Sequence, residues 1–149
     1  MTEDLEAAAR LGRRLGHVFH DPALLQQALT HRSYVNEHPG ERDNGALAFL
    51  GDAVLALVVG EHVWREHPQE AEGQLTPRRA DLVSGTNLAR WAAAVELGSC
   101  LRLGRGEALM GGREKDSLLA TALEAVLGVV YLEGGLEAAR RAVATLASW

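Results

Sequence analysis

The chain has 149 residues, of which 47% are hydrophobic and 5% aromatic, and its formal net charge at pH 7 is −5. This length suffices for one hydrophobic core, and the acidic balance excludes a protein that binds nucleic acid through its overall charge alone. Cys100 is the only cysteine, so an internal disulfide is excluded and a reducing compartment is expected. We expect a single all-α domain over residues 1–149, located in the cytoplasm, with no signal peptide and no membrane contact, because no uninterrupted apolar run reaches about 18 residues.

The first part of the chain predicts two helices and a loop. Apolar residues at helical spacing predict an amphipathic helix over residues 3–15. Asp21 as the N-cap and Pro22 in the first turn predict a second helix that runs to Leu29. The polar stretch over residues 36–44 is typical of a loop.

The longest apolar stretch follows Asn44, a good N-cap residue, and predicts a central helix from about Leu47 to Glu66. One carboxylate, Asp52, interrupts this stretch. Because an unpaired carboxylate in an apolar helix is strongly unfavourable, it needs a hydrogen-bond donor, an opposite charge or a metal ion. Two interpretations stay open here: Asp52 stabilises a neighbouring helix, or it belongs to a functional site.

The rest of the chain is also helical by pattern. It predicts a helix over residues 76–96, a glycine-rich basic loop over 101–115 and a strongly apolar helix over 116–132. A turn at 134–135 then leads into a final helix that ends near Trp149. No repeat or linker divides the chain.

The helix over residues 116–132 holds one acid, Glu124, in surroundings as apolar as those of Asp52. If the two helices pack antiparallel, the acids face each other and can share a divalent cation, since Mg²⁺ takes one or two protein carboxylates. The alternative is that each acid pairs with an arginine. Signatures of zinc sites, di-iron bundles, nucleophile elbows and Walker loops are absent from the sequence.

Several short motifs occur in a defined order along the chain. They are LTHRSY at 29–34, FLGDAVL at 49–55, GGREKDSLLA at 111–120, LEAVLG at 123–128 and YLEGG at 131–135. Over residues 11–146 this order of motifs resembles the endonuclease domain of the ribonuclease III family. The resemblance implies an all-helical fold, a two-fold homodimer and double-stranded RNA as the ligand.

The resemblance also implies an active site of four carboxylates, at positions 48, 52, 121 and 124. Of these the chain retains Asp52 and Glu124, which are the predicted catalytic residues and the predicted ligands of Mg²⁺ or Mn²⁺. Ala48 cannot bind a metal ion, and Thr121 offers only a neutral oxygen. Losing two negative charges weakens metal binding and relieves repulsion in the empty site. We therefore expect the metal site to be weakened or absent, and RNA cleavage to be impaired.

The family resemblance suggests further site residues. His31, Arg32, Arg113 and Lys115 are predicted to contact RNA. Phe49 is predicted to insert into a second subunit as the dimer anchor, the alternative being an ordinary core phenylalanine. Residues 1–149 are expected to hold no C-terminal double-stranded-RNA-binding domain of the kind usual in the family, either because the chain is part of a longer protein or because it is a short family member.

Three functions stay open on the sequence alone. The first is a metal-dependent endoribonuclease that processes double-stranded RNA, ribosomal RNA included. The second is a catalytically inactive dimeric scaffold that holds structured RNA, in association with the ribosome or ribosomal RNA. The third is a protein-interaction module, which the net charge of −5 favours.

Overall fold

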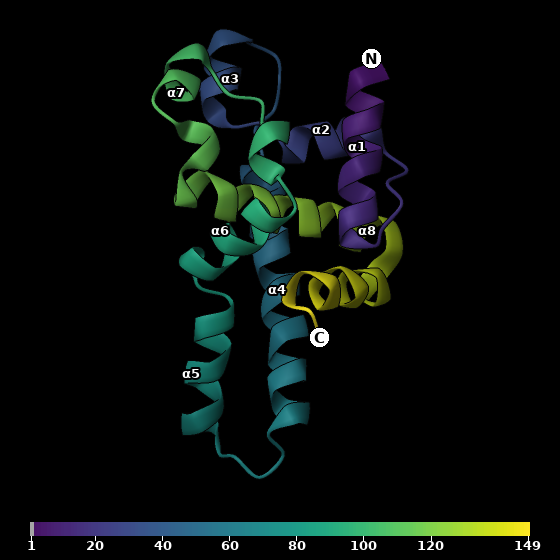
Figure 1. Ribbon diagram of the computed structural model, residues 1–149, viewed down its shortest axis with the longest axis vertical. Coiled ribbons are helices and arrows are strands. Elements are labelled where there is room, and N and C mark those ends of the chain that lie inside the picture. The colour runs from purple at the N-terminus through teal and green to yellow at the C-terminus, as the bar shows by residue number, and fades with distance from the viewer. Residues whose placement is uncertain (1) are drawn as a thin grey trace.

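The computed structural model describes residues 2–149, and these form a bundle of helices (Figure 1). The only extended pairing in this part of the chain is one parallel bridge between Thr30 and Arg102. The predicted all-α class is thereby confirmed. The helices are α1 (Thr2–Leu15), α2 (Pro22–Ala28), α3 (Arg32–Glu37), α4 (Gly45–Glu66), α5 (Glu72–Leu82), α6 (Gly85–Ala94), α7 (Arg105–Leu109) and α8 (Asp116–Ala147), with 3₁₀ turns at Leu97–Cys100 and Gly112–Glu114.

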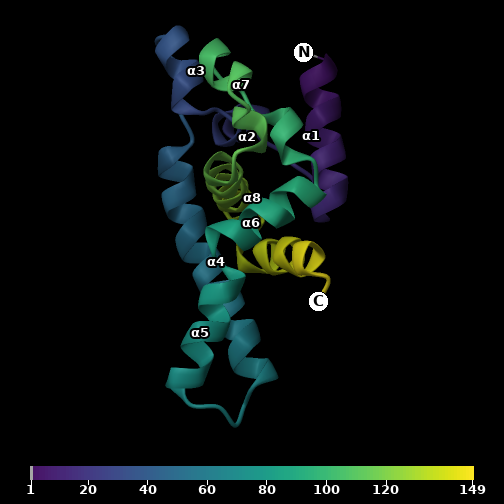
Figure 2. The same ribbon diagram turned by 60° about the vertical axis from the view of Figure 1, so that its left-hand side comes forward.

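The two long apolar helices, α4 and α8, form the centre of the molecule. They cross each other instead of packing antiparallel (Figures 1 and 2). A Cβ atom on Gly51 would lie 1.6 Å from the carbonyl oxygen of Glu124, and one on Gly128 would lie 2.7 Å from that of Leu47. The two backbones are therefore in direct contact where the helices cross.

Both α4 and α8 are long and apolar enough to span a membrane by length and composition. Within the structure they are core helices, and residues such as Val59 and Leu127 are fully buried in protein. Because a buried core helix has the same composition as a membrane span, this property is weak evidence for membrane insertion.

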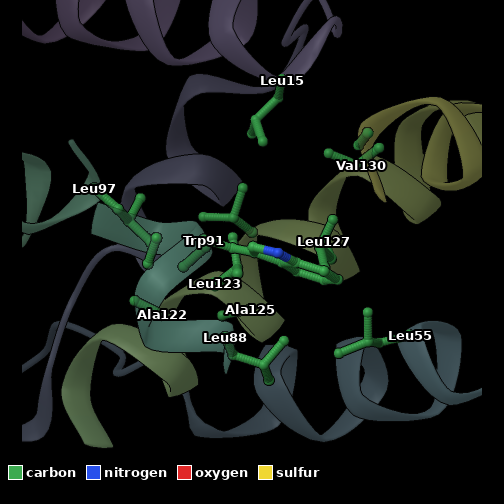
Figure 3. Close-up of a cluster of buried hydrophobic side chains, with 14 of the residues drawn as sticks. Leu15, Leu55, Leu88, Trp91, Leu97, Ala122, Leu123, Ala125, Leu127 and Val130 are labelled. Carbon is green, nitrogen blue, oxygen red and sulfur yellow. The ribbon is translucent and has the colours of Figure 1, made fainter. Parts of the chain in front are cut away.

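Trp91 of α6 lies at the middle of the buried side chains that surround this crossing (Figure 3). The cluster draws on α1, α4, α6, α8 and the turn at Leu97–Cys100, so that one core joins segments far apart in the sequence. Its labelled members are Leu15, Leu55, Leu88, Leu97, Ala122, Leu123, Ala125, Leu127 and Val130.

The start of α4 differs from the prediction in its capping. Asn44 does not cap the helix with its side chain. Its amide group instead donates to the carbonyl oxygen of Ala28 at 3.0 Å, while the carboxylate of Asp43 accepts from the Gly45 amide at 3.0 Å. Asn44 thus joins α2 to α4, which local sequence signals do not reveal.

The single helix predicted over residues 76–96 is wrong, because the structure has two helices there. α5 already begins at Glu72, and Pro77 lies inside it. The chain then leaves the helical path, and the Ser84 hydroxyl oxygen accepts a hydrogen bond from the Asn87 amide at the start of α6. A serine N-cap therefore divides what the apolar pattern predicted as continuous.

The two segments predicted as loops also contain helical turns. α3 extends to Glu37 and α7 follows Gly104. The Gly104 amide donates to the Ser33 hydroxyl at 2.9 Å, and the Arg105 amide donates to the Glu37 carboxylate at 2.7 Å. Helices this short are unstable alone, so these contacts between distant segments stabilise both.

The predicted break in the last helix is confirmed, because Gly135 has φ of 70° and ψ of −167° inside α8. Just before it, the Glu133 carboxylate accepts from His17 Nε2 at 2.8 Å and from the amides of His20 and Asp21 at 3.0 and 2.8 Å. Burial alone would raise the pKa of Glu133, but the hydrogen bonds from His17 and the two amides lower it overall. Glu133 therefore holds the α1–α2 connection against α8.

We predict that Gly51→Ala lowers the free energy of unfolding by about 3 kcal/mol or more, because its Cβ would push α4 and α8 apart. Urea unfolding measures this loss. Gly60→Ala is the matched control on the same helix, since its Cβ would meet only the Arg79 side chain at 3.6 Å. That variant should be neutral or more stable by up to about 1 kcal/mol. Equal effects of the two changes would contradict a direct backbone contact at Gly51.

Candidate active site

The crossing of α4 and α8 brings Asp52 and Glu124 together. Gly51 faces the backbone of Glu124, and Asp52 is the next residue of α4. Asp52 is exposed and Glu124 is half-buried, and the two carboxyl groups are close enough for a hydrogen bond. The structure thus places next to each other two acids that are 72 positions apart in the sequence.

This proximity changes the titration of Glu124, whose pKa is raised to about 8. Burial is the largest cause, followed by the hydrogen bond with the Asp52 carboxyl group and the repulsion by its charge. At pH 7 Glu124 is therefore mostly protonated in the absence of a cation. A bound cation would replace that proton and remove the repulsion between the acids.

The positions beside the pair carry no charge. Ala48 is buried one turn before Asp52, and Thr121 is partly buried one turn before Glu124. In the part of the chain that the structure describes, no three or more histidine, cysteine, aspartate or glutamate side chains are grouped closely enough to hold a metal ion. Two carboxylates are still enough for a cation such as Mg²⁺ that completes its shell with water and phosphate oxygens.

The alternative in which each acid pairs with an arginine is wrong. Within residues 2–149, every arginine ion pair involves another acid: Glu41, Glu61, Glu70, Glu96 or Glu137. The pair of acids is therefore available to an external cation.

Three of the four predicted RNA contacts are engaged within the chain. His31 Nδ1 accepts from the Ser33 amide at 3.1 Å and caps α3, and burial is the main cause of its lowered pKa. Arg113 Nη1 donates to the carbonyl oxygens of residues 101 and 98, at 2.5 and 3.2 Å. Lys115 forms an ion pair with Glu107 at 3.0 Å. Arg32 is exposed and has no such partner among the described residues.

Sequence reasoning missed Arg102, which anchors this region. Its guanidinium donates to the Thr30 hydroxyl at 3.2 Å and to the Tyr34 hydroxyl at 2.8 Å, and it lies 4.2 Å above the centre of the Tyr34 ring. A further ion pair joins it to Glu41 at 3.4 Å. Arg102 therefore positions α3 and its first residue, Arg32, against the glycine-rich segment. No periodicity or capping signal marks it in the sequence.

Phe49 lies on the surface of α4, where 82% of its area is exposed. The alternative of an ordinary core phenylalanine is therefore wrong. The exposed ring lies on the same helix as Asp52 but is not covered by any other part of the described chain.

We predict that in metal-free buffer the free energy of unfolding falls as pH rises from about 5 to 8. The direction follows from the raised pKa of Glu124. Between pH 5 and 8 the native state keeps a proton on Glu124 that the unfolded state has released. The stabilisation present at low pH is therefore lost as pH rises. Glu124→Gln should flatten this fall, as measured by urea unfolding at several pH values with a chelator. Glu114→Gln, at an exposed acid, is the control and should keep the wild-type pH dependence. An unchanged slope in Glu124→Gln would contradict the assignment.

Comparison with known proteins places this geometry in a family. The family model described as ribonuclease-III-like matches residues 21–148. Proteins named Ribonuclease 3 are similar in sequence: that of Desulforamulus reducens is 50% identical over 145 residues, which are 96% of this chain and 59% of the relative. That of Pseudomonas syringae pv. syringae is 49% identical over 135 residues, 91% of this chain and 57% of the relative.

A solved structure is also similar. The nuclease domain of ribonuclease III from Campylobacter jejuni superposes with a TM-score of 0.86 at 39% sequence identity, covering 94% of this chain and 93% of that domain. The chain spans about three fifths of the length of the curated relatives it matches. The match over most of the chain, in sequence and in fold, shows that the protein belongs to the ribonuclease-III-like family.

Proposed function

We propose that this chain binds double-stranded RNA as a two-fold dimer and that its metal-dependent cleavage of phosphodiester bonds is strongly reduced. The observation that carries the proposal is the Asp52–Glu124 pair, flanked by Ala48 and Thr121 where the family resemblance implies two further acids. The fold and the retained pair support an RNA site of the ribonuclease III type. The two uncharged neighbours support a loss of catalytic efficiency.

The reduction follows from the chemistry of the donor set. A divalent cation, when bound, lowers the pKa of a bound water and polarises a phosphodiester. Asp52 and Glu124 would hold Mg²⁺ or Mn²⁺, and Glu124 would have to release its proton to do so. Ala48 supplies no oxygen and Thr121 a neutral one, so the cation is held less tightly than by four carboxylates.

A scaffold that holds RNA without cutting it is the limiting case of the same proposal. Protonation of Glu124 at pH 7 lowers the charge repulsion that an empty site of four acids would suffer. The fold can therefore keep its RNA-facing surface without a metal ion. Ribosomal RNA belongs to the structured RNAs on which binding should be assayed.

The proposed dimer uses the exposed apolar face of α4. Phe49, Leu57 and Trp64 are all more than half exposed, and their spacing places them on one side of the helix. Leu57 and Trp64 also line a groove of about 500 Å³ between α4 and α5. An exposed aromatic side chain on an apolar helix face is typical of a protein interface. A second structure of the Campylobacter jejuni nuclease domain describes flexibility in a region involved in dimer formation.

We predict that Phe49→Asp weakens the dimer at least about 30-fold, as expected when a buried aromatic anchor is lost. Light scattering after size exclusion at micromolar protein should show the mass halved. Leu109→Asp is the matched control, because Leu109 is a similarly exposed apolar residue on α7 and should leave the mass unchanged. A dimer that survives Phe49→Asp would place the interface elsewhere.

We also predict that duplex RNA is bound but cut slowly in Mg²⁺ or Mn²⁺. Combining Ala48→Glu with Thr121→Asp should raise the cleavage rate about 10–100-fold by restoring two acids around the cation. The readout is the rate of product formation on a gel, with RNA binding measured in parallel over a range of salt concentrations.

Asp52→Asn is the control for this experiment, and it should abolish the restored activity while preserving binding. Efficient cleavage by the unmodified chain, with no gain on restoration, would contradict the proposed impairment. Failure to bind any duplex would contradict the RNA function altogether and favour a protein-interaction module.

A further inference from the structure

One face of α1 is apolar and incompletely covered. A groove of about 420 Å³ lies between this helix and the segment that follows it. Leu5 on α1 and Val18 beyond its end are 52% and 73% exposed. Between them the floor is formed by Ala8 and Ala9 of α1 and by Gly12, which is buried against the His17 backbone. The face could therefore accommodate another helix at close range.

Four charges line one flank of this apolar face. Glu3, Glu6, Arg10 and Arg13 follow one another at intervals of three or four positions, so they lie along one side of the helix. None of the four forms an ion pair within the described part of the chain, whereas Arg14 of the same helix does. Along the flank the order of charge is two negative residues followed by two positive ones.

Two copies of this flank place opposite charges against each other when the helices run antiparallel. If a second copy of α1 packs antiparallel about a two-fold axis near Ala8, Glu3 lies opposite Arg13 of the second copy and Glu6 lies opposite its Arg10. A parallel two-fold pair would place this flank beside the opposite flank of the second helix, so these ion pairs would not form. We propose that α1 is a self-association surface that pairs antiparallel with α1 of a second copy of this chain.

This surface is separate from the α4 face of the proposed dimer. Figure 2 shows α1 and α4 on opposite sides of the molecule, with α8 and α6 between them. Pairing through α1 therefore joins the units that α4 forms into a larger assembly of at least twice the mass, and it does not depend on the proposed function. Two different two-fold interfaces on one chain produce either a closed tetramer or an open chain of subunits.

The proposed contact is small, since it consists of one helix and the short segment after it on each side. Association should therefore be weak, with a dissociation constant of tens of micromolar or higher. Because the ion pairs are exposed, it should weaken further at high salt.

Sedimentation equilibrium at about 100 μM protein and low salt tests the proposal. The wild type should show a mass at least twice that of the unit that α4 forms. Glu3→Arg with Glu6→Arg, and separately Arg10→Glu with Arg13→Glu, should each weaken association by about tenfold or more. An equimolar mixture of the two variants should regain it, because opposite flanks then face each other. Val18→Asp, which leaves the α1 sequence intact, should also reduce association.

The matched control is Asp81→Arg with Glu114→Arg, which changes the net charge as much as the Glu3 and Glu6 changes do. It should associate like the wild type, since both acids are exposed and lie outside α1. Repeating the series in the Phe49→Asp background separates loss of α4 pairing from loss of α1 pairing. The proposal is overturned if the wild type shows no doubling beyond the α4 unit, or if the mixed charge-reversed variants fail to regain it.

Discussion

The close crossing of α4 and α8 is the contact on which the rest of the structure depends. Gly51 and Gly128 allow the two backbones to touch, and this contact holds the longest apolar helices at the middle of the core. The same contact sets the positions of Asp52 and Glu124, because each acid is attached to backbone that lies at the crossing. Fold stability and site geometry therefore depend on one pair of glycines.

Electrostatics explains how the fold accommodates two neighbouring acids, Asp52 and Glu124, where α4 and α8 cross. The half-buried Glu124 lies beside the exposed Asp52 without two adjacent negative charges at pH 7, because burial and the neighbouring acid raise the pKa of Glu124 to about 8. With Ala48 and Thr121 beside them, no further charge has to be neutralised.

The surfaces of the molecule differ in how many of their side chains form contacts within the chain. Around α3 and α7, Arg102, Arg113 and Lys115 are largely occupied in holding short segments together. By contrast, the apolar side chains of Phe49, Leu57 and Trp64 on α4 are more than half exposed, and the charged flank of α1 forms no ion pair in the described chain. The number of basic residues is therefore a poor guide to ligand contacts here, because several of these side chains form hydrogen bonds and ion pairs within the chain.

The sequence by itself determined the all-α class, the two long apolar helices, the break at Gly135 and the two candidate acids. These features follow from apolar periodicity, glycine conformation and motif order, which are local properties of the chain. Only the tertiary structure decided that α4 and α8 cross and that Ser84 divides one predicted helix. It also decided that α3 extends into one predicted loop and that α7 forms inside the other. Finally, it decided that Asp52 and Glu124 lie next to each other, which raises the pKa of Glu124, and that Arg102 holds α3 in place. Each of these depends on hydrogen bonds, burial or backbone contact between residues distant in the sequence, and their energies have no signature in the local pattern.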